Sequence, residues 1–167
     1  VCLGAAAVWL ARSPRVFRAA PAQAGGEAAE EDASVRRWEA AVRAQDRMAI
    51  ARTESDVIRQ GDAAVPFLAR TAQESSELAS DVVRLLGRIR STASVSALDR
   101  LHRDLGASQG LVLRSAVLRA LAEIGGQTAR EAFLALLRDE ADPSVQQTAA
   151  ALAPTLLRPE DIASLPP

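Results

Sequence analysis

A repeat is the feature of this sequence that most constrains its fold. Segment 82–104 recurs at 117–139 with an offset of 35 residues, which relates Leu86 to Leu121, Ile89 to Ile124, Leu101 to Leu136 and Asp104 to Asp139. An earlier copy at 61–68 and a later half copy at 142–152 are offset by 30 and 32 residues from the segments that they match. Periods of this length, built from helices, are typical of solenoids, in which each unit buries its apolar face only by stacking on its neighbours.

The segment 113–139 shows what one repeat contains. Its apolar residues are spaced by three and four positions before Gly125 and again after Gly126, as on the buried face of a helix. Two successive glycines suit a helix C-terminus, where one residue commonly adopts a left-handed conformation that a Cβ would oppose. The segment is therefore predicted to be a helical hairpin with a tight turn at the glycines.

Composition limits both the fold and its ligands. The chain has 167 residues, of which 49% are hydrophobic and only 3% aromatic, so one domain with a core of leucine, valine, isoleucine and alanine is expected. A net charge of −1 gives no general attraction to the phosphates of nucleic acid. Cys2 and His102 are the only residues of their types, which excludes an intrachain disulfide and a multi-histidine metal site. We expect no cofactor, no metal and no nucleic-acid partner.

The N-terminal residues 1–20 have features of a targeting or anchoring segment. Val1 to Ala11 is an apolar run about as long as a signal-peptide core, shorter than the ~20 residues that span a bilayer, and arginines follow it. These features favour the cell envelope over the cytoplasm as the location. The alternatives are a mis-assigned gene start and a disordered apolar tail. Residues 21–33, rich in glycine, alanine and acids, are predicted to be a flexible linker before a helix that Asp32 or Ser34 caps.

Residues 34–158 are predicted to form the helical domain, followed by a tail at 159–167. The first helix starts near Ser34 and places Trp38 in the core, and a second helix runs from residue 47 to residue 60. Pro154 and Pro159 are expected to stop the last helix, because proline has no backbone N–H to donate.

Four short motifs resemble the HEAT repeat, especially the short bacterial type that also occurs in phycobilisome-lyase-like proteins: Leu86-Gly87-Arg88-Ile89, Ala64-Val65-Pro66, Leu121-Ala122-Glu123-Ile124-Gly125 and Asp142-Pro143-Ser144-Val145. The resemblance implies an all-α, right-handed α-solenoid of about three and a half helical hairpins with an N-terminal capping helix, of the armadillo-like helical kind. It also implies that the second helices line a concave face. Most family members bind proteins, and a minority are enzymes. The arginine that the family usually carries near the start of each first helix is retained only as Arg114.

The enzymes that this family contains require residues that the chain lacks. Iron hydroxylases of this type hold two metal ions with paired His-Glu motifs, whereas His102 stands alone and matches the apolar Leu137 of the next repeat, which predicts a partly buried, non-catalytic histidine. Glycosylases of this type place aromatic side chains over a damaged base, whereas Phe67 and Phe133 occupy core-facing positions. Bilin-attaching lyases remain open by fold, although no convergent Cys, His and Asp set supports one. The chain is predicted to have no catalytic residue.

The candidate partner-binding residues are arginines that recur on the predicted second helices, namely Arg70, Arg100, Arg103 and Arg138. Two interpretations stay open. The arginines complement the negative ends of their helices, or they form a ridge that binds an acidic segment of a partner, since arginine is enriched at interface hot spots. Arg84 and Arg119 occupy matching positions on the first helices, and their replacement by glutamate is expected to be neutral, as a control for partner binding.

These observations predict a monomeric, non-catalytic scaffold for protein–protein interaction, tethered to the cell envelope by its N-terminal segment. The alternative is an assembly factor or chaperone-like helper for a cofactor protein. A small enzyme is the third and weakest hypothesis.

Overall fold

The computed structural model describes residues 24–158 and 161, which form helices and turns and include no strand. Side chains are described for this range except at 24–28 and 105–109. The helices are α1 (Ala24–Arg43), α2 (Arg47–Gln60), α3 (Val65–Glu74), α4 (Ala79–Ile89), α5 (Thr92–Ile124), α6 (Gly126–Asp139) and α7 (Pro143–Leu156). Short 3₁₀ turns at Gly61–Ala64 and Ser76–Leu78 precede α3 and α4. The predicted all-α class is confirmed.

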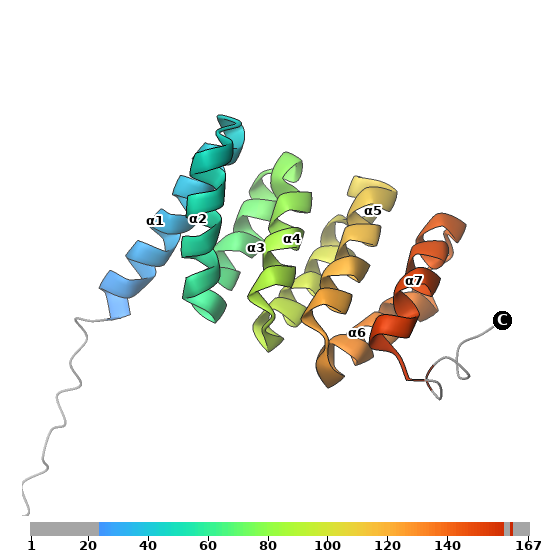
Figure 1. Ribbon diagram of the computed structural model, residues 1–167. Helices are drawn as coiled ribbons and strands as arrows, with labels where there is room; N and C mark the ends of the chain where they lie inside the picture. Colours follow the sequence, from blue (N-terminus) through green and yellow to red (C-terminus); the bar gives the residue numbers. More distant parts are fainter. Residues whose placement is uncertain (1–23, 159–160, 162–167) are drawn as a thin grey trace, which may run out of the picture.

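The helices stack in two layers (Figure 1). The first-helix layer contains α2, α4, the second half of α5 (residues 111–124) and α7. The second-helix layer contains α1, α3, the first half of α5 (residues 92–109) and α6. Neighbours within a layer touch, as α2 touches α4 and α1 touches α3. Across the layers, α1 packs on α2, α3 on α4, α5 on α6 and α6 on α7, and the 3₁₀ turn at Gly61–Ala64 contacts both α2 and α3. Three hairpins, preceded by α1 and followed by α7, confirm the predicted solenoid of about three and a half repeats.

Glycines set the direction changes between the helices. Gly110, with φ of 68° and ψ of −156°, interrupts α5 and lets its two halves lie in different layers. Gly125 and Gly126 have φ of 69° and 79°, so the predicted tight turn between α5 and α6 is confirmed. Both are conformations that a Cβ disfavours.

Close packing in the first-helix layer depends on another glycine. A Cβ built at Gly87 of α4 would lie 3.1 Å from the Cα and Cβ of Ala120 in α5. This distance is shorter than carbon atoms normally tolerate, so any larger side chain would push α4 and α5 apart. The leucine-glycine pair of the repeat motif therefore has a packing role.

The core runs continuously between the layers. Trp38, Leu86, Leu121 and Phe133 are fully buried within it, and no other aromatic side chain in the described part of the chain is as deeply buried as Trp38 and Phe133. The predicted core position of Trp38 is confirmed. Because each repeat contributes to one shared core, removing a core side chain from one hairpin should also destabilise the neighbouring hairpins.

Two predicted boundaries are wrong. Helix α1 begins at Ala24, so most of residues 21–33 are helical and do not form a linker. Alanine and glutamate favour helix there, and Asp32, within the helix and not at its N-cap, forms ion pairs of 2.6 Å with both Arg36 and Arg70. Helix α7 continues past Pro154 to Leu156, because a proline near the C-terminus removes only one hydrogen bond. Residues 1–20 and, except for Asp161, the tail at 159–167 lie outside the described residues.

Candidate functional site

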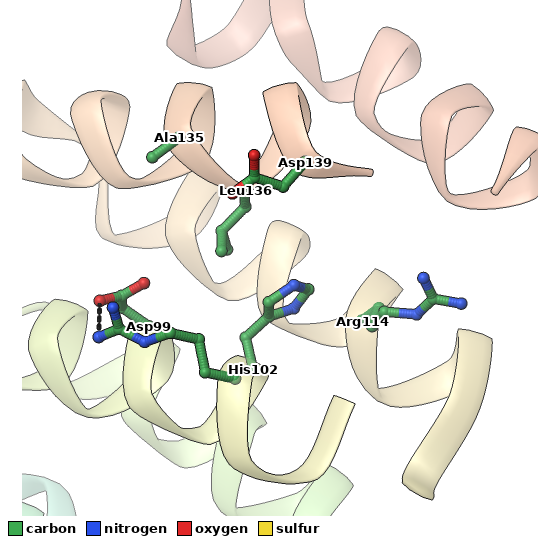
Figure 2. A pocket seen from close by; sticks show the side chains of 7 residues that line it. Asp99, His102, Arg114, Ala135, Leu136 and Asp139 are labelled. Atoms are coloured by element: carbon green, nitrogen blue, oxygen red, sulfur yellow. Dashed lines mark hydrogen bonds and ion pairs between the residues drawn. The ribbon is translucent and has the colours of Figure 1, made fainter. Parts of the chain in front are cut away.

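A cavity of about 470 Å³ lies between α6 and the two halves of α5. It is lined by polar residues of three segments together with two apolar residues of α6: Asp99, His102 and Arg103 from the first half of α5, Arg114 from the second half, and Ala135, Leu136 and Asp139 from α6. The hairpin fold brings these segments together, because α5 reverses at Gly110 and α6 starts directly after the glycine turn. In Figure 2, Leu136 points toward the His102 ring, and the guanidinium of Arg114 points away from it.

His102, the one histidine of the chain, lines this cavity. Burial lowers its pKa from the ordinary value of 6.5, against the opposing field of the Glu140 carboxylate, so the imidazole is neutral at pH 7. Its Nδ1 atom is buried and has no hydrogen-bond partner within the described structure. The ring is half-buried, as its apolar counterpart Leu137 suggested from the repeat.

Arg114 connects the cavity to the next repeat. Its Nη1 donates to Glu140 Oε1 over 2.7 Å, and its Nη2 lies 4.0 Å from Asp142 Oδ2. Glu140 also accepts a hydrogen bond from the backbone N–H of Asp142, at the N-cap of α7. The one family-type arginine that the sequence retains therefore holds the start of the next first helix. Its Nε is buried and lacks a hydrogen-bond partner among the described residues.

Asp139 and Arg138 form the exposed last turn of α6. Neither makes an ion pair or a side-chain hydrogen bond with any residue that the structure describes. Asp139 lines the cavity, so it presents an unneutralised carboxylate to whatever enters.

The other three predicted arginines are already paired. Arg70 lies 2.6 Å from Asp32 and 5.6 Å from the ring centre of Phe67, and Arg100 lies 3.4 Å from Asp104. Arg103 lies 2.5 Å from Asp99, and it is the only one of the four predicted arginines that lines the cavity.

The interpretation of these arginines as helix-end residues is wrong for Arg70, Arg100 and Arg103, because Arg70 lies before the last turn of α3. The first half of α5 continues to the kink at Gly110, so neither Arg100 nor Arg103 lies in a last helical turn. Arg138 does lie in the last turn of α6, where its charge complements the helix dipole.

A second polar cluster, in the first-helix layer, was missed from the sequence. Glu54 of α2 is 6% exposed and accepts hydrogen bonds of 2.5 Å from Arg84 and 2.6 Å from Arg88, both on α4. Burial alone would raise the pKa of Glu54, but the two guanidinium groups together bring it below its ordinary value. Arg84 is thus a structural residue, whereas the neutrality of Arg84→Glu for partner binding stays a prediction. The available signal was the position of Glu54 on the apolar face of α2.

A comparison with protein families identifies the fold. A family model described as HEAT repeats matches residues 64–153, more than half of the chain. The chain belongs to the HEAT-repeat family. No curated protein and no solved structure matches this HEAT-repeat protein. HEAT repeats generally mediate protein–protein interaction, and the family is typically non-catalytic.

The described part of this HEAT-repeat protein contains no group of three histidine, cysteine or acidic residues arranged to hold a metal ion. Within the same residues, every helix is too short or too polar to cross a membrane. The cavity between α5 and α6 is the candidate site that brings one of the predicted arginines together with His102, and its chemistry is that of charge, hydrogen bonding and an imidazole.

Proposed function

We propose that this HEAT-repeat protein is a non-catalytic scaffold that holds a segment of a partner protein on its second-helix layer, centred on the cavity between α5 and α6. The observation that carries the proposal is the exposed Asp139 carboxylate, which lines the cavity and makes no ion pair with a described residue. Two buried nitrogens of the lining residues, His102 Nδ1 and Arg114 Nε, also lack a hydrogen-bond partner among the described residues. Buried polar groups in folded proteins are almost always hydrogen-bonded. Several such groups around one accessible cavity favour a binding role for it.

The predicted arginines extend this surface. The ion pairs of Arg70, Arg100 and Arg103 are largely exposed, and exposed pairs typically contribute ~0–1 kcal/mol, so an acidic segment of a partner can exchange with the acids of this chain at small cost. Arg138 needs no exchange, because no described residue neutralises it. These features support an arginine ridge that contacts acidic residues beside the cavity.

A non-catalytic role agrees with the residues of the cavity. The lining contains no serine, threonine or cysteine that could act as a nucleophile. His102 makes no hydrogen bond to a described carboxylate that would orient it as a general base.

Site-specific cross-linking tests which layer binds. A photo-reactive amino acid is placed at Ala135, exposed beside the cavity, and in a matched protein at Arg119, exposed on the first-helix layer. We expect one defined partner to be cross-linked from Ala135 only. The triple variant Arg100→Glu, Arg103→Glu and Arg138→Glu should reduce that yield, because it replaces attraction by repulsion. Equal yields from both positions, or a yield from Arg119 alone, would remove the second-helix layer as the interface.

The N-terminal segment is the basis of a further part of the proposal, tethering to the cell envelope. The apolar run Val1 to Ala11 supports it. The full chain should fractionate with membrane or envelope, and a chain starting at Ala24 should not. Recovery of both in the soluble fraction would contradict tethering. Helper activity in the assembly of a cofactor protein would use the same surface, and a cofactor protein as the cross-linked partner would favour that alternative.

A further inference from the structure

We propose that the cavity between α5 and α6 is a receptor for a basic side chain, arginine or lysine, carried by the partner segment. This inference rests on the proposed function and adds the chemical identity of the group that enters the cavity. The basic side chain in the cavity is a different group from the acidic segment that contacts the arginine ridge. The partner segment would therefore carry acidic residues for the ridge and one basic residue for the cavity.

The charges around the cavity favour a cation. The charged groups that line it are the carboxylates of Asp99 and Asp139 and the guanidinium groups of Arg103 and Arg114. Arg103 pairs with Asp99, and Arg114 pairs with Glu140, which does not line the cavity. The Asp139 carboxylate is therefore the one charged group of the lining that makes no ion pair with a described residue.

An acidic occupant would meet competition that a basic occupant avoids. Exchange with Asp99 at the exposed Arg103 pair would cost a carboxylate little, but it could reach Arg114 only by competing with the buried Glu140 at 2.7 Å. The Glu140 side chain is only 3% exposed, so its displacement would leave a buried carboxylate without its counter-ion. A guanidinium or ammonium group instead meets Asp139 without breaking an existing pair.

His102 completes the receptor. Its imidazole is neutral at pH 7 and adds no repulsive charge, and its ring offers a flat face on which a guanidinium can stack. The guanidinium of Arg114 points away from the ring (Figure 2), so it does not cover the ring face. The volume of about 470 Å³ falls within the range of ligand pockets and exceeds the needs of a single arginine side chain.

The experiment uses His102 as a reporter, because it is the only histidine in the chain and its ring signals in an NMR spectrum have one source. The full chain is titrated at pH 7.5 with the N-acetylated amide of arginine and, separately, with that of glutamate. We expect the arginine compound to shift the His102 ring signals in a saturable manner, and the glutamate compound to leave them unchanged. A shift by the glutamate compound equal to or larger than that by the arginine compound would overturn the assignment of a basic occupant.

Variants test the residues that carry the inference. Asp139→Asn should weaken binding of the arginine compound about fivefold, as expected for one lost ion pair. The matched control Asp104→Asn, an α5 acid that pairs with Arg100 outside the cavity, should change binding by less than about twofold. His102→Leu installs the side chain found at the equivalent position 137, so it should fold normally and abolish the shift that the arginine compound causes at the backbone amide of Leu136.

The outcomes separate this inference from the proposed function. No saturable shift with either compound would overturn the cavity as a side-chain receptor, even where Ala135 still cross-links a partner. Loss of selective cross-linking at Ala135, with the arginine response intact, would instead contradict the proposed scaffold function. Equal weakening by Asp139→Asn and Asp104→Asn would show that a diffuse negative field, and not the cavity, attracts the arginine compound, and would also overturn the inference.

Discussion

Two polar clusters join neighbouring repeats of this protein, and they differ in how fully their groups are satisfied. In the first-helix layer, the buried Glu54 receives hydrogen bonds from both Arg84 and Arg88. In the second-helix layer, Asp139 has no ion pair with a described residue and His102 Nδ1 has no hydrogen-bond partner among them. A satisfied buried cluster contributes to the fold, whereas the exposed and unpaired carboxylate of Asp139 is available to a ligand. Substitutions should therefore affect stability in the first cluster and binding in the second.

The largest expected effect lies in the core that both clusters share. Phe133→Ala should lower the free energy of unfolding by ~3–5 kcal/mol, because it removes a fully buried aromatic ring and leaves a cavity. The control Arg90→Ala, in the turn between α4 and α5, should change it by less than ~0.5 kcal/mol. Chemical denaturation monitored by circular dichroism measures both. Equal costs would contradict the repeat register that places Phe133 in the core.

The next largest effect on stability is expected at Glu54, in the first-helix cluster. Glu54→Gln should cost ~1–3 kcal/mol, because two guanidinium groups lose their common carboxylate. The value stays below that of a fully buried ion pair, since the side chains of Arg84 and Arg88 are 44% and 42% exposed and can regain water. Asp81→Asn, which removes an exposed partner of Arg84 at 3.3 Å, is the control and should cost less than ~0.5 kcal/mol. A cost for Glu54→Gln as small as that of the control would show the cluster to be incidental.

The pH dependence of unfolding provides an independent check on Glu54. Its pKa in the folded protein lies below the ordinary value of 4.5, so folding favours its charged form. The stabilisation is complete above pH 4.5 and is lost as the pH falls through the lowered pKa. The acid-induced loss of stability should therefore be smaller in Glu54→Gln than in the wild-type protein, and identical curves would contradict the ion cluster.

The cavity should respond differently to substitution. His102→Leu should leave stability unchanged or raise it by up to ~1 kcal/mol at pH 7, because it removes an unpartnered buried nitrogen. The pKa of His102 is lowered in the folded protein, so protonation favours the unfolded chain, and the wild-type protein should lose stability as the pH falls below 6.5. Besides burial, the charges that act on the pKa of His102 are those of Glu140, Arg114, Asp99 and Arg103. This loss should be absent in His102→Leu, and its persistence would assign it to another group.

The smallest stability effect is expected at Asp139. Asp139→Asn should change the free energy of unfolding by less than ~0.5 kcal/mol, since the exposed carboxylate has no described partner to lose. Thermal unfolding followed by calorimetry measures the difference. A destabilisation of more than ~1 kcal/mol would show that Asp139, like Glu54, stabilises the folded protein.

The sequence was sufficient for the repeat fold because burial follows local periodicity. The offset that pairs Leu86 with Leu121 also located Phe133 in the core and the turn at Gly125, since each depends on neighbours within one hairpin. The start of α1 was missed, because the composition of residues 24–33 suits both a linker and a helix. The contact of Asp32 with Arg70, 38 residues away, holds this segment on α3.

Only part of the candidate site could be predicted from the sequence. Arginine recurrence identified Arg103. The sequence also places an acid four residues from Arg100 and another four residues from Arg103, and on one helix this spacing lets each acid neutralise its arginine. The cavity itself could not be predicted, because it depends on the reversal of α5 at Gly110 and on Arg114 turning toward Glu140. His102 stood out as a polar residue at an apolar repeat position, yet its unpartnered nitrogen is a property of the packed structure.

The most direct test of the central claim compares Glu54→Gln and Asp139→Asn in the same two assays, stability and cross-linking of the partner from Ala135, at a temperature where both variants are fully folded. We predict that Glu54→Gln lowers the midpoint of unfolding and keeps the cross-linking yield, whereas Asp139→Asn keeps the midpoint and lowers the yield. If both variants change the midpoint of unfolding and the cross-linking yield in parallel, the two clusters do not differ in role. That result would contradict the assignment of the Glu54 cluster to the fold and of the Asp139 cluster to binding.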